Sequence, residues 1–129
     1  MRFAKWLPAI LWTALILSFS NDSFSSDSTE GWLEVIAHAD VPEAANDILR
    51  KGGHILGYAV LAMLGWFADR RILRPLLIAF VVAIADETKQ SFTLLREGSP
   101  WDVILDTSSA SLALLVAEKI RYIRHTVKK

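Results

Sequence analysis

Residues 75–106 restrict the fold more than any other stretch, because an apolar run leads directly into a group of charged residues. From Pro75 to Ala85 there are eleven uncharged, mostly large apolar residues. Four polar residues follow with no turn residue in between: Asp86, Glu87, Lys89 and Gln90. A surface helix of a globular protein would distribute such residues along one face. Their position at one end predicts a helix that enters lipid at Pro75 and ends in a polar site.

The composition limits the classes of protein that the chain can belong to. With 129 residues, the chain is expected to form a single domain, residues 1–129. Hydrophobic residues make up 53% and the mean hydropathy is +0.34. The formal net charge is zero, which argues against a nucleic-acid partner. The absence of cysteine excludes disulfides, thiol catalysis and cysteine-ligated metal sites.

The apolar stretches predict an all-α integral membrane protein, a compact bundle of four transmembrane helices at about residues 3–20, 51–68, 75–92 and 101–120. Residues 3–20 also fit a secretory signal peptide, but the lack of a clear cleavage pattern after them favours a span. Gly57 and Gly65 are expected to let the second helix approach its neighbours closely.

The distribution of charge predicts how this bundle is oriented in the membrane. Residues 21–49 contain seven acids and no lysine or arginine, and they are expected to form an extracytoplasmic loop. Ten of the fourteen lysines and arginines lie near the termini or between the second and third spans. By the positive-inside rule, the termini are cytoplasmic and the protein is a multi-pass protein of the bacterial cytoplasmic (inner) membrane.

Polar residues recur at helical spacing in the last three spans. Lys51, His54 and Tyr58 share one face of the second helix, and Asp102 and Asp106 share one face of the fourth. Ionisable groups at membrane depth normally face one another, so these faces are expected to converge with that of the third helix. The candidate ligand-binding residues are Lys51, His54, Tyr58, Asp86, Glu87, Gln90, Arg96, Asp102 and Asp106.

The charges of this expected site are unbalanced. Two cations, Lys51 and Arg96, stand against four carboxylates, so the pKa of at least one buried carboxyl should be raised. A neutral acid beside a carboxylate is suited to proton transfer. If the site is catalytic, the candidate residues are His54, Asp86, Glu87 and Asp102.

The ordered set Lys51-x-x-His54-x-x-x-Tyr58, Asp86-Glu87-x-x-Gln90-x-Phe92-x-x-x-Arg96 and Ser99-x-x-Asp102-Val103 resembles the VanZ-like family over about residues 48–117. The resemblance implies a small bacterial integral membrane protein with an envelope role linked to glycopeptide (teicoplanin) resistance. It also implies that all but Asp106 of the nine candidate residues are signature positions. Asp106 replaces the usual asparagine and adds a negative charge, and Ser109 replaces the usual glycine, which should loosen a helix contact.

Three functions remain open. The first, which we favour, is a polar pocket at the outer leaflet that binds an anionic lipid-linked envelope component, such as a lipid-linked phosphate or cell-wall precursor, held by Lys51 and Arg96. The second is an enzyme that hydrolyses or transfers a group on such a lipid, with Glu87 or Asp86 as base. The third is a structural subunit whose polar cluster only holds the bundle together.

No cofactor is expected. Imidazole and carboxylate ligands suit Mg, Mn or Zn, but the sequence has no HExxH-type spacing, and Lys51 and Arg96 would oppose a bound cation. The expected partners are therefore the lipid bilayer and the anionic envelope component.

Overall fold

The computed structural model describes residues 3–19, 43–92 and 98–127. These residues form a short 3₁₀ helix, η1 (Phe3–Trp6), followed by α1 (Leu7–Phe19), α3 (Glu43–Ala68), α4 (Leu73–Gln90) and α5 (Pro100–Val127). The all-helical architecture agrees with the sequence pattern, and each of the four α-helices coincides with one of the four predicted apolar stretches.

Several helix ends differ from the predicted bounds. Helix α3 begins at Glu43 rather than at residue 51, so residues 43–49 are helical although they were predicted to belong to the acidic loop. Helix α5 continues to Val127. Acidic residues are favourable in the first turn of a helix, and alanines such as Ala44 and Ala45 are good helix formers, so the acidic composition did not exclude a helix. Residues 21–42 of the predicted loop lie outside the described residues.

The prediction of four transmembrane helices is wrong. Among the described residues, no helix combines the length and the hydropathy that are needed to cross a bilayer. Helix α1 is apolar but has 13 residues, whereas a span needs about 20. Helix α4 includes Arg74, Asp86, Glu87 and Lys89 within its 18 residues. The predicted multi-pass topology, cytoplasmic termini and outer-leaflet position of the polar site rested on these spans and lose their basis.

The helices pack through small side chains. Helix α3 contacts α1, α4 and α5, and α5 lies along both α3 and α4. Ala62, Ala79, Ala83 and Ala110 are completely buried between them. A Cβ atom on Gly65 would lie 3.0 Å from Cβ of Pro75, so α3 and α4 touch closely at this point. Alanine and glycine at these positions allow the helix axes to come near one another.

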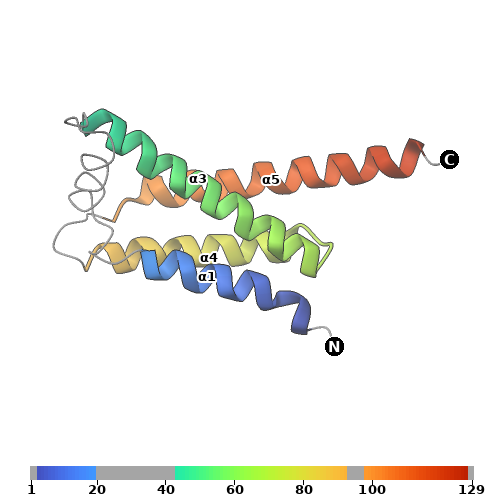
Figure 1. Cartoon of the computed structure of the whole chain (residues 1–129), viewed down its shortest axis with the longest axis horizontal. Coiled ribbons are helices and arrows are strands. Elements are labelled where there is room, and N and C mark those ends of the chain that lie inside the picture. The colour runs from blue at the N-terminus through green and yellow to red at the C-terminus, as the bar shows by residue number, and fades with distance from the viewer. Residues whose placement is uncertain (1–2, 20–42, 93–97, 128–129) are drawn as a thin grey trace, which may run out of the picture.

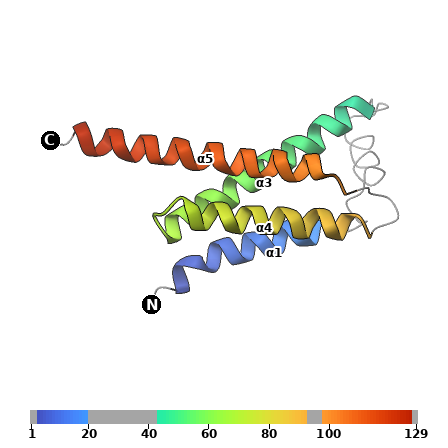
Figure 2. The ribbon, with the colours of Figure 1, turned by 180° about the vertical axis from the view of Figure 1, so that it is seen from behind.

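The arrangement of the helices brings distant parts of the chain to the same end of the molecule. The start of α1, the connection between α3 and α4 and the end of α5 lie at one end, and α5 extends beyond the other helices (Figure 1). The rear view shows the same arrangement (Figure 2). The start of α3, the end of α4 and the start of α5 therefore meet at the opposite end, where the polar residues are.

Candidate functional site

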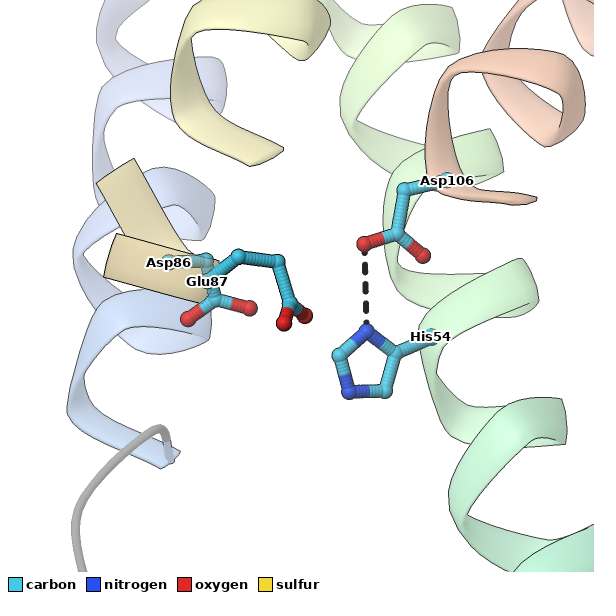
Figure 3. A group of neighbouring side chains, drawn as sticks. All are labelled: His54, Asp86, Glu87 and Asp106. Carbon is cyan, nitrogen blue, oxygen red and sulfur yellow. Dashed lines mark hydrogen bonds and ion pairs between the residues drawn. The ribbon is translucent and has the colours of Figure 1, made fainter. Parts of the chain in front are cut away.

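Four side chains from three helices form a polar cluster: His54 on α3, Asp86 and Glu87 on α4, and Asp106 on α5 (Figure 3). One potential ligand atom of each residue lies within 4.8 Å of those of the other three. The three acids are buried, with exposed fractions of 3%, 5% and 0% in sequence order. Buried charges normally require partners, so the cluster is energetically costly unless its charges are compensated.

His54 and Asp106 form the central pair of the cluster. Nδ1 of His54 lies 3.1 Å from Oδ2 of Asp106, the contact marked in Figure 3. The hydrogen bond to Asp106 raises the pKa of His54, although burial alone would lower it. Burial raises the pKa of Asp106. Whether the proton lies on His54 or on Asp106, the pair retains it to a higher pH than an isolated histidine does.

Glu87 is held by the backbone at the start of α5. Its Oε2 accepts a hydrogen bond of 2.7 Å from the backbone N–H of Ser99. Gly98 makes this contact possible, because a Cβ atom there would overlap Oγ of Ser91 and the carbonyl oxygen of Glu87. Burial nevertheless raises the pKa of Glu87. Its other oxygen, Oε1, is buried and has no hydrogen-bond partner among the described residues, and the same holds for Oδ1 of Asp106.

Asp86 is held by two polar neighbours. The hydroxyl of Tyr58 donates to Oδ2 of Asp86 at 3.4 Å, and Nε2 of Gln90 donates to the same oxygen at 3.3 Å. Both distances are long for hydrogen bonds. Burial raises the pKa of Tyr58, so its hydroxyl stays protonated and available as a donor. These contacts help to orient Asp86 toward the cluster.

The structure brings together most of the predicted site residues. His54, Tyr58, Asp86, Glu87, Gln90 and Asp106 meet as the spacing predicted. Asp102 is half-buried, and its negative charge contributes to the raised pKa values of Glu87 and Asp106. Lys51 is exposed. Arg96 lies outside the described residues.

Some contacts that shape the site could not be read from the sequence. The hydrogen bond from Ser99 to Glu87 is a backbone contact, for which no side-chain pattern exists. Oγ of Ser109 donates to the carbonyl oxygen of Ile55 at 2.5 Å and so connects α5 to α3. The expectation that Ser109 loosens the helix contact overlooked this hydrogen bond.

A hollow of about 460 Å³ lies between α3 and α5, at the end of the bundle away from the polar cluster. Its lining includes Trp66, Arg70 and Arg121, and the guanidinium of Arg70 stacks 4.3 Å from the centre of the Trp66 ring. None of the four cluster residues lines it. The cluster is therefore a compact group of side chains, separate from this hollow.

The chemistry open to the cluster follows from its donor set. An imidazole that shares a proton with a buried carboxyl can exchange that proton with a ligand. One imidazole nitrogen and three carboxylates can also coordinate a divalent cation. No local sequence spacing indicates such a site, because its ligands come from three different helices.

Comparison with known proteins gives a family match. The family model described as VanZ/LLP1 matches residues 5–121 of the chain. No curated protein and no solved structure matches the chain significantly. The matched region includes all of α3 and α4 and every residue of the polar cluster.

Proposed function

Because the chain belongs to the VanZ/LLP1 family, we propose that it is a bacterial envelope protein whose polar cluster binds an anionic, phosphate-bearing envelope component. Family members are generally associated with membranes. The proposed location is the bacterial cytoplasmic membrane, and the proposed physiological context is the glycopeptide tolerance that the resemblance implies.

One observation carries the proposal of a binding site: within the part of the chain that the structure describes, Oε1 of Glu87 and Oδ1 of Asp106 are buried without a hydrogen-bond partner. A buried polar atom with no partner costs about 1–3 kcal/mol. A cluster that served only to hold helices together would be expected to satisfy its own polar atoms. A ligand that contacts these oxygens would recover the cost.

Two cations near the cluster favour an anionic ligand. Lys51 lies one turn before His54 on α3 and is exposed, so its ammonium can contact a ligand that binds beside the cluster. Arg96 follows α4 by six residues in the sequence, and a guanidinium suits bidentate contact with phosphate. Neutral Glu87 and Asp106, favoured by their raised pKa values, would donate hydrogen bonds to phosphate oxygens.

Membrane association is supported by the outer surface of the helices as well as by the family. On α4, the exposed side chains include Leu77, Val81 and Ile84, whereas Ala79 and Ala83 are among the buried residues. Large apolar side chains of α4 thus lie on its outer surface. Such an outer surface suits contact with lipid or with an apolar partner.

The binding proposal is tested by the thermal stability of the purified chain with a panel of phosphorylated envelope lipids. A ligand that binds only the folded state raises the melting temperature. We expect a shift with one phosphorylated lipid, and at least about tenfold weaker binding in Arg96→Ala, as expected for loss of a charge-assisted contact. Arg71→Ala is the matched control, because Arg71 is exposed at the other end of the bundle.

Two results would reject anion binding at this site. One is the absence of a shift with any lipid. The other is equal weakening in Arg96→Ala and Arg71→Ala, which would indicate a general charge effect. If the wild-type chain shows no shift with any lipid and Arg96→Ala only melts at a lower temperature, the structural role of the cluster is favoured.

The second candidate function is hydrolysis or group transfer on the same lipid. It is favoured by Glu87, whose buried Oε1 has no partner and whose raised pKa suits an acid–base group. Glu87→Gln should then abolish turnover even at saturating lipid, where weaker binding does not limit the rate. Retained turnover in this variant would exclude Glu87 as the acid–base residue.

A further inference from the structure

Two acids of the polar cluster, Glu87 and Asp106, lie apart from the lysines and arginines of the described residues. None of these cations is within ion-pair distance of either carboxyl, and His54 pairs with Asp106. Lys89, which neighbours the cluster in sequence, donates instead to the carbonyl oxygen of Leu17 at 2.6 Å. In their ionised forms, Glu87 and Asp106 together therefore carry more negative charge than His54 can compensate, and a bound cation would balance the remainder.

An unpartnered oxygen of Glu87 gives an independent indication of where that cation would lie. Oε1 of Glu87 has no hydrogen-bond partner among the described residues, and its side chain is more than nine-tenths buried. In Figure 3, the Glu87 carboxyl extends from α4 toward His54 and Asp106, whereas the Asp106 oxygen outside the dashed contact lies on the side away from Glu87. A polar atom that is buried without a partner marks the place of an absent ion or ligand.

The spacing of the four residues suits a metal ion. Metal–ligand bonds to nitrogen and carboxylate oxygen are about 2.0–2.2 Å, so opposite ligands of an octahedral ion are about 4.2 Å apart. The corresponding atoms of the cluster all lie within 4.8 Å of one another. Adjacent ligands of such an ion are only about 3 Å apart, so the side chains would also have to move toward one another to close around it. Water alone would satisfy the oxygens but would leave the charge uncompensated.

We propose that His54, Asp86, Glu87 and Asp106 form a binding site for one divalent cation. The mixture of one imidazole and three carboxylates suits Mn²⁺ or Zn²⁺ better than Ca²⁺, which takes oxygen ligands alone. Asp106 is then a metal ligand, and its carboxylate supplies an oxygen with full negative charge. The cation site stands on the geometry of the cluster.

The cation also explains how an acidic cluster can bind an anion, a step that rests on the proposed function. A divalent ion held by carboxylates would attract phosphate oxygens directly, in the way that Mg²⁺ and Mn²⁺ join phosphates to acidic sites. Lys51 and Arg96 would then add to the attraction rather than provide all of it. Phosphate affinity should therefore depend on the metal.

The site is tested by titrating the EDTA-treated, dialysed full chain with Mn²⁺ and following the loss of the free Mn²⁺ signal by electron paramagnetic resonance. We expect saturable binding of one ion per chain. Glu87→Gln and Asp106→Asn should each weaken the affinity at least tenfold, as expected for the loss of a charged ligand. Their matched controls, Glu118→Gln and Asp69→Asn, remove the same charge at the far end of the bundle and should bind as the wild type does.

A measurement on the wild-type chain keeps the test independent of folding defects in the variants. The sequence has three histidines, at positions 38, 54 and 125. Bound Mn²⁺ should broaden the ring resonances of His54 at substoichiometric metal and leave those of His125 unchanged. The proposal is overturned by the absence of saturable binding, by equal losses in cluster variants and controls, or by His54 resonances that do not broaden.

The proposed function and the cation site fail in different ways. If Mn²⁺ binds but no phosphorylated lipid does, the function is wrong and the cation site stands. If a lipid binds equally well in excess EDTA and with Mn²⁺, the bridging role is wrong and the lipid site stands.

Discussion

At the scale of single residues, the pair of His54 and Asp106 decides how the cluster responds to pH. The two residues are 52 positions apart in the sequence, and Nδ1 of His54 lies 3.1 Å from Oδ2 of Asp106. Asp106 is fully buried, so its carboxylate is stabilised only if a proton on His54 or a bound cation compensates the charge. Asp106 thus brings a requirement for positive charge with it.

We predict that the metal-free protein becomes less stable as the pH rises. The folded state raises the pKa values of His54, Asp106 and Glu87, so it binds more protons than the unfolded chain. Stability therefore falls as the pH rises, and the contribution of His54 is lost above its ordinary value of 6.5. Urea unfolding in EDTA between about pH 5 and 9 measures the slope.

The matched histidine variants identify the residue responsible for this slope. His54→Gln should flatten the fall above about pH 6.5, its ordinary pKa, whereas the exposed His125→Gln should leave it unchanged. Stability that rises with pH over this range, or the same fall in His54→Gln, would contradict the prediction.

At the scale of helices, close packing depends on where glycine and alanine lie. Gly65 of α3 faces Pro75 of α4 directly, whereas Gly57 has no heavy atom nearer than Cγ1 of Ile16, at 4.0 Å from a Cβ built there. The expectation of a close approach therefore holds at Gly65 and not at Gly57. The backbone carbonyl of Gly57 instead accepts a hydrogen bond of 2.9 Å from Nε1 of Trp12 on α1.

We predict opposite effects for two glycine-to-alanine substitutions in α3. In Gly65→Ala, the new methyl group would press on the Pro75 ring, and the cost of overpacking should exceed the gain in helix propensity by about 1 kcal/mol. In Gly52→Ala, nothing lies within 4 Å of the added Cβ, so stability should increase by about 0.5–1 kcal/mol. Chemical denaturation of both variants compares them, and a stabilised Gly65→Ala would show that α3 and α4 can separate without cost.

At the scale of the whole molecule, the cluster exists only when three helices are packed together. α3 supplies His54, α4 supplies Asp86 and Glu87, and α5 supplies Asp106. In the folded chain the four ligand atoms lie within 4.8 Å of one another, and the unfolded chain does not hold them together. A cation would therefore bind the folded state selectively. Metal binding and global stability are therefore expected to be coupled.

We predict that Mn²⁺ raises the stability of the wild-type chain and that EDTA reverses the effect. At a free concentration one hundred times the dissociation constant, the gain should be about 2.7 kcal/mol. Thermal unfolding with and without metal measures it, and Asp106→Asn should show a much smaller gain than Asp69→Asn. An equal gain in both variants would place the effect outside the cluster.

Much of the helical architecture could be predicted from the sequence, because local patterns control it. The apolar runs located all four helices, and helical spacing located the faces that converge. The spaced sets were Lys51, His54 and Tyr58, then Asp86 and Glu87 with Gln90, then Asp102 with Asp106. Length and hydropathy did not support the step from apolar helix to membrane span, since the charged residues of α4 lie within the helix itself. Helix ends were also misplaced, because an acidic composition permits a helix as readily as a loop.

The sequence by itself therefore determined the helices, the composition of the cluster and its excess of carboxylates. Only the tertiary structure decided that His54 pairs with Asp106, that the backbone of Ser99 holds Glu87, and that two carboxyl oxygens remain without partners. The physical reason is that helix periodicity acts between residues three or four positions apart. Distances between α3, α4 and α5 depend instead on how closely their alanine and glycine faces pack, which no local pattern specifies.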